Sequence, residues 1–139
     1  MRDERTVRDE LARSAPGGSP RDQKLRQAGF AYLHVGILYE AAAWVMIQRG
    51  ALPTRFGPPA LWLLGGAAVV ALIFWLLYFK RSVWTARLVW GTHALRLPAL
   101  IGGAFFPAEA TRFAPGFYIT ALVVVVINLA FLARAGWDL

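Results

Sequence analysis

Four long apolar blocks dominate the chain, and short polar or proline-rich segments separate them. The blocks cover approximately residues 28–48, 60–79, 83–105 and 116–134. A helix of about 20 apolar residues is long enough to cross the hydrocarbon core of a bilayer. The pattern therefore predicts an all-α integral membrane protein, a bundle of four transmembrane helices in which residues 20–139 form the membrane domain.

The N-terminal segment has a different character. Residues 1–19 interleave acids and bases without an apolar core, which excludes a secretory signal and predicts a charged, partly disordered cytoplasmic tail. Ser19, Pro20 and Asp22 then form a helix-start signature: a capping serine, a proline in the first turn and an acid three residues after the cap. The first helix should run unbroken from there into the membrane.

Lysine and arginine residues beside the spans predict the orientation. Ten lie at the N-terminal segment, at the "KRS" hairpin of residues 80–82 and at the C-terminal end, and three lie in the two other loops. Positive loops stay in the cytoplasm, so both termini are expected there, with the chain in the cell membrane as a multi-pass protein. The net charge of +7 then serves lipid headgroups and orientation, and no nucleic-acid partner is expected.

The third span is the least regular of the four. It contains Arg87, His93, Arg96 and Pro98. A central arginine costs about 2.5–3.5 kcal/mol on an insertion scale, and Pro98 leaves the Ala94 carbonyl without its helical partner. Arg87 lies near the cytoplasmic end and can extend to the headgroups. The span is expected to cross the membrane, supported by neighbouring helices. The alternative is that it lies in the membrane interface, which would place the C-terminus outside.

The polar residues within the spans fall on defined helix faces. At about 100° per residue, His93 and Arg96 share one face of the third span, and Tyr39 and Glu40 share one face of the first. Antiparallel passage places Glu40 and Arg96 at nearly equal depth. We therefore expect a buried polar cluster of Glu40, His93, Arg96 and Tyr39, with a Glu40–Arg96 ion pair that holds the bundle together.

A second contact between helices is expected elsewhere in the bundle. His34 lies about 120° around the first helix from Glu40, and it shares a depth with Asn128 of the fourth span. The pattern predicts a hydrogen bond between these two side chains, of the kind that joins membrane helices.

The first span also has a family resemblance. "GILYEAAAW" at 36–44, "FWLL" at 74–77 and "VINLAFL" at 126–132 resemble segments of small multidrug-resistance-type transporters. The resemblance implies proton-coupled export of cationic compounds with Glu40 as the proton carrier. The chain departs from that pattern in its long N-terminal tail, its long third loop, and the arginine and histidine of its third span. An arginine beside the acid would repel cationic substrates.

Two other classes of function follow from particular residues. His34 and His93, on two helices, could ligate a b-type haem, although their estimated depths differ by about 6 Å at helical rise. The chain has no cysteine, which excludes disulfides and thiolate metal sites, and no motif of an enzyme or of a resident metal site is present. No enzymatic activity and no cofactor are expected.

The remaining class is a small multi-pass membrane protein that acts by interaction. Such a chain would be an accessory or assembly subunit or an oligomeric module. Its expected partners are the lipid bilayer and other membrane-protein chains, or further copies of itself.

Overall fold

The computed structural model describes residues 18–50, 58–106 and 113–139, which form five helices and no strand. The helices are α2 (Pro20–Gln48), α3 (Pro59–Tyr78), α4 (Val83–Ala94), α5 (Leu97–Phe105) and α6 (Pro115–Trp137). Three of them, α2, α3 and α6, are long and apolar enough to cross a membrane. The predicted tail lies outside the described residues, apart from Gly18 and Ser19.

The predicted start of the first helix is confirmed. The Ser19 hydroxyl accepts a hydrogen bond from the Asp22 amide, and the Asp22 carboxylate accepts one from the Ser19 amide, both at 3.2 Å. This reciprocal pair satisfies two amide groups that the first helical turn leaves without partners. The helix then continues without a break for 29 residues.

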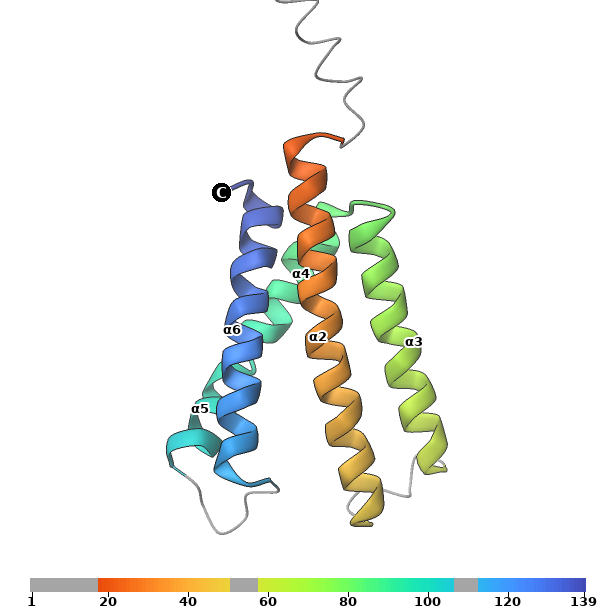
Figure 1. Cartoon of the computed structure of the whole chain (residues 1–139), viewed down its shortest axis with the longest axis vertical. Coiled ribbons are helices and arrows are strands. Elements are labelled where there is room, and N and C mark those ends of the chain that lie inside the picture. The colour runs from red at the N-terminus through yellow and green to blue at the C-terminus, as the bar shows by residue number, and fades with distance from the viewer. Residues whose placement is uncertain (1–17, 51–57, 107–112) are drawn as a thin grey trace, which may run out of the picture.

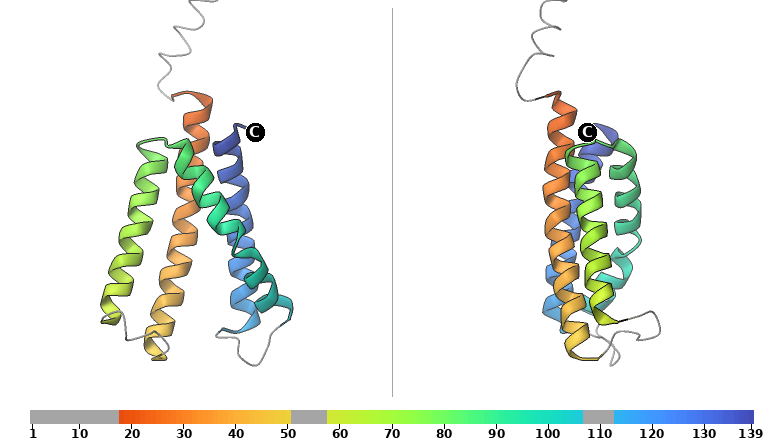
Figure 2. Two further views of the ribbon diagram at one scale, coloured as in Figure 1. Left: turned by 180° about the vertical axis from the view of Figure 1, so that it is seen from behind. Right: turned by 90° about the vertical axis from the view of Figure 1, so that its right-hand side faces the viewer.

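The third predicted span consists of two helices and not one. α4 ends at Ala94, and α5 begins at Leu97 with Pro98 in its first turn. Proline has no amide hydrogen to donate to the Ala94 carbonyl, and its ring crowds the preceding turn, so the helix breaks there. Neither α4, with 12 residues, nor α5, with 9, is long enough to cross a bilayer alone. Together they extend along the bundle between the hairpin and the opposite end (Figure 2).

α2 lies between α3 and α6, and α4 and α5 pack against α6 (Figure 1). The start of α2 and the end of α6 lie at the same end of the molecule (Figure 1). At that end one core cluster joins α2, α3, α4 and α6 through side chains that include Leu25, Leu77 and Leu132. A second cluster, Val35, Val125 and Leu129, holds α2 to α6 near the middle.

Beyond the second cluster the helices separate into two pairs. α2 and α3 remain together, α5 and α6 remain together, and α3 diverges from α4 and α5 (Figure 2, left). Among the side chains of α3, only that of Leu77, near the hairpin, is buried.

Polar contacts hold the helix ends together where α2 begins and α6 ends. We call this the closed end of the bundle. Arg81, in the hairpin, donates to the Asp22 carboxylate at 2.7 Å, and Lys24 pairs with Asp138 at 2.9 Å. The Arg87 side chain donates to the Gly136 carbonyl at 2.9 Å and lies over the ring of Trp137. Arg87 therefore satisfies a carbonyl at the end of α6, in a position where a cation also favours the helix dipole.

Candidate functional site

All four residues predicted to form a polar cluster line one cleft. It has a volume of about 610 Å³ and lies between α2, α3 and α4. We call it the charged cleft and define it by six of its residues, Tyr39, Glu40, Trp62, Gly66, His93 and Arg96. Its position matches the divergence of α3 from α4 and α5 (Figure 2, left).

Glu40 extends from α2 toward α3, where a glycine makes room for it. A Cβ atom at Gly66 would overlap Oε1 of the Glu40 carboxylate, so the carboxylate lies directly against the α3 backbone. The half-buried Glu40 also lines a second groove, of about 530 Å³, together with Gly36, Trp44 and Ala67.

Arg96 lies at the break between α4 and α5. It is the N-cap residue of α5, and its amide donates to the His93 carbonyl in the tight turn between α4 and α5. Its guanidinium lies 4.8 Å from the centre of the Tyr39 ring, within the range of a cation–π contact. The Arg96 side chain is exposed in the isolated chain.

The cleft holds Glu40 and Arg96 without an ion pair between them. Two ion pairs form among the described residues, Arg81–Asp22 and Lys24–Asp138, and neither involves the charges of the cleft. In place of the predicted Glu40–Arg96 pair, Glu40 packs on Gly66 and Arg96 stacks on Tyr39. The two charges line one cavity, but Glu40 contacts Gly66 of α3 and Arg96 contacts the ring of Tyr39.

His93 is the buried member of the cluster. Its ring packs against Tyr32 and Tyr39, with centroids 5.7 and 6.0 Å away. Asn128 of α6 is completely buried, and its Nδ2 lies 3.4 Å from Nδ1 of His93, so the two side chains share a hydrogen bond. Asn128 therefore bonds to His93 and not, as predicted, to His34.

His34 lies apart from the cleft. Its Nδ1–H donates to the Phe30 carbonyl of its own helix at 2.8 Å, and its exposed side chain lines a groove against Val124 and Ile127 of α6. His34 and His93 thus line different cavities, and this arrangement does not suit axial ligation of one haem. Within the described segments no three histidine or acidic side chains group together as metal ligands.

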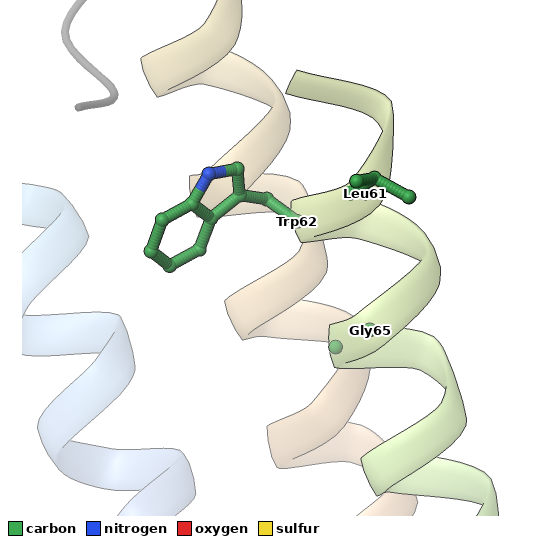
Figure 3. A pocket seen from close by; sticks show the side chains of 4 residues that line it. Leu61, Trp62 and Gly65 are labelled. Carbon is green, nitrogen blue, oxygen red and sulfur yellow. The ribbon is translucent and has the colours of Figure 1, made fainter. Parts of the chain in front are cut away.

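Two aromatic residues of the cleft were not in the predicted cluster. Tyr32, two helical turns before Tyr39, contacts the His93 ring. Helical projection places Tyr32 on the same face of the first helix as Glu40, and this position could have identified it. Trp62 lines the cleft from α3. Figure 3 shows the indole of Trp62 extending from one side of α3 and Leu61 from the other, with Gly65 about one turn farther along the helix.

Comparison with known protein families, with characterised proteins and with solved structures finds no match to this chain.

Proposed function

We propose that this chain is a multi-pass protein of the cell membrane that acts by interaction, as an accessory or assembly subunit or an oligomeric module, and that the charged cleft is where a membrane helix of its partner docks. One observation carries the proposal. Glu40 and Arg96 line an open cleft between helices and have no ionic partner among the described residues.

The charges, and not the apolar surface, require a partner. Many apolar side chains of α3 are exposed, among them Leu64 and Leu72. Lipid tails cover such side chains without cost, because the hydrocarbon of a bilayer is as apolar as leucine. An ionised glutamate or arginine at that depth is costly unless protein or water surrounds it. A docked helix with complementary polar groups would satisfy both.

The proposal includes four crossings with both ends in the cytoplasm. It is supported by the lysine and arginine residues near the closed end and by the antiparallel course of α2, α3, the α4–α5 pair and α6 (Figure 1). Because the chain has no cysteine, single cysteines at Ser82 and at Gly50 can be labelled in vesicles of known sidedness. A membrane-impermeant maleimide should label position 82 only from the cytoplasmic face and position 50 only from the other. Labelling of both positions from one face would contradict this topology.

Native size in lipid nanodiscs tests the docking. The wild-type chain should be found in a complex, and Glu40→Gln and Arg96→Gln should each weaken that complex by at least about tenfold, since each leaves one charge without its partner. His34→Gln is the matched control, because His34 lies on α2 but lines a different groove. A wild-type monomer that purifies without any partner, or equal loss in the His34 variant, would contradict the proposal.

Proton-coupled transport with Glu40 as carrier is a second candidate, and one observation favours it. The Glu40 carboxylate has no ion pair in the described segments and lines a cleft of about 610 Å³, within the usual range of small-molecule sites. In proteoliposomes with an imposed pH gradient, uptake of a cationic dye that is lost in Glu40→Gln and kept in Arg96→Gln would favour transport. Absence of any gradient-driven uptake would exclude it for that class of substrate.

A further inference from the structure

We infer that the helix docking in the charged cleft belongs to a second copy of this chain. In the resulting twofold dimer, Glu40 of each copy meets Arg96 of the other. The inference rests on the proposed docking function and names its partner. It follows from the signs of the two charges, their heights along the bundle and the surface of α3 beside the cleft.

The acid and the base of one cleft are complementary to the base and the acid of the same cleft in a second copy. A cleft with one acid and one base needs a partner that offers one base and one acid in return. A twofold interface presents the same patch on both sides. If residue i of one copy contacts residue j of the other, residue j of the first copy also contacts residue i of the second. A second copy therefore supplies both missing charges, and two Glu40–Arg96 pairs form at once.

The heights of the two charges agree with this symmetry. Copies inserted with the same orientation are related by an axis along the membrane normal, and rotation about that axis leaves the depth of every atom unchanged. Arg96 lies over the ring of Tyr39, at 4.8 Å, and Tyr39 precedes Glu40 by one residue, a rise of about 1.5 Å. Glu40 and Arg96 are therefore at similar depth, as pairing across such an axis requires.

The surface of α3 beside the cleft can meet a second copy. α3 diverges from α4 and α5 (Figure 2, left), and Leu77 is its single buried side chain. A Cβ atom added at Gly65 would meet no other atom within 4 Å, so the α3 surface is bare there and permits close approach of a second helix. The aromatic ring of Trp62 lies at the same end of α3 (Figure 3).

Mixing of charge-reversed variants tests the pairing. Glu40→Arg and Arg96→Glu are made in separately labelled full-length chains, and association is measured by energy transfer in proteoliposomes. Each variant alone should dimerise at least about tenfold more weakly than the wild type, because each homodimer opposes like charges. The mixture should recover dimers, because the two variants together restore opposite charges across the interface. Dimerisation of either variant at wild-type strength would overturn the inference.

Neutral variants cover the case in which charge reversal prevents folding. A dimer of Glu40→Gln with Arg96→Gln keeps one intact pair, whereas each variant's homodimer keeps none. Heterodimers should therefore exceed the statistical share of one half in an equal mixture. A statistical distribution in that mixture would overturn the inference, as would a wild-type chain that stays monomeric in lipid at every density tested.

The outcomes separate this inference from the function on which it rests. If the wild-type chain is found with a different membrane protein, and Glu40→Gln breaks that complex, the docking function stands and the second copy is wrong. If neither glutamine variant alters any association, both are wrong.

Discussion

Asn128 and His93 form a polar contact between α6 and α4 inside an otherwise apolar core. Asn128 is fully enclosed, His93 is 5% exposed, and Val125 and Leu129 lie beside the contact. In such a place an unpaired polar atom costs more than a formed bond gains, so each side chain depends on the other. The same bond orients the His93 ring toward Tyr39 and so toward the charged cleft.

Replacement of Asn128 by leucine tests this dependence. The substitution keeps a similar volume but leaves His93 without its partner, and the free energy of unfolding should fall by about 1 kcal/mol, as is typical of hydrogen bonds between membrane helices. Thermal or denaturant unfolding in mild detergent measures the change. Thr120→Ala is the matched control on α6, because Thr120 is exposed and its hydroxyl donates to the Gly116 carbonyl of its own helix. Equal stability of the Asn128 variant and the wild type would contradict a structural role for the bond.

At the scale of elements, the short α5 helix is held by close approach to α6. Its packing depends on Gly103, which is buried against the Tyr118 ring of α6. A Cβ atom at Gly103 would lie 2.5 Å from Cδ1 of Tyr118, far inside contact distance. Small residues at such positions let two helix backbones approach in a membrane. The preceding residue, Gly102, has no atom within 4 Å of the corresponding position.

The two adjacent glycines form a matched pair of substitutions. Gly103→Ala should destabilise the protein by about 1–3 kcal/mol, because the aromatic ring must move out of a packed contact. Gly102→Ala should be neutral or slightly stabilising, since alanine has the higher helix propensity and meets no neighbour. Unfolding midpoints of both variants in the same detergent give the comparison. Similar effects at the two positions would mean that α5 does not pack on α6 through this face.

At the scale of the whole molecule, an ion pair joins the beginning of α2 to the residue that follows α6. Lys24, in the first turns of α2, pairs with Asp138 just after α6, although 114 residues separate them in the sequence. The hydrogen bond and the positive charge of Lys24 lower the pKa of the Asp138 carboxyl below its ordinary value of 3.8. The folded state therefore favours the ionised form of Asp138. Its contribution to the free energy of unfolding is complete at pH values above 3.8. It is lost as the pH falls through the lowered pKa of the folded state.

Asp138→Asn tests this ion pair. At pH 7 the variant should melt slightly below the wild type. The difference should shrink as the pH falls below 3.8 and vanish once Asp138 is protonated in the folded protein. The expected effect is small, because the pair is solvent-exposed, and it should decrease further in high salt. Melting curves in detergent across this pH range measure it. A difference that persists unchanged at the lowest pH would show that its origin is not the charge of Asp138.

The sequence by itself determined the three long helices and much of the surroundings of the polar residues. Apolar block length gives α2, α3 and α6, and the Ser19–Asp22 capping signature gives the start of α2, because these features depend on local contacts within a few residues. Tertiary structure decided the partners. The projection that placed Arg96 opposite Glu40 assumed one straight third helix, and the break before Pro98 redirects the chain at Arg96. Which side chain a polar residue contacts depends on the tilt of neighbouring helices and on contacts between helices, such as that of Glu40 with Gly66. The pattern along one helix does not contain this information.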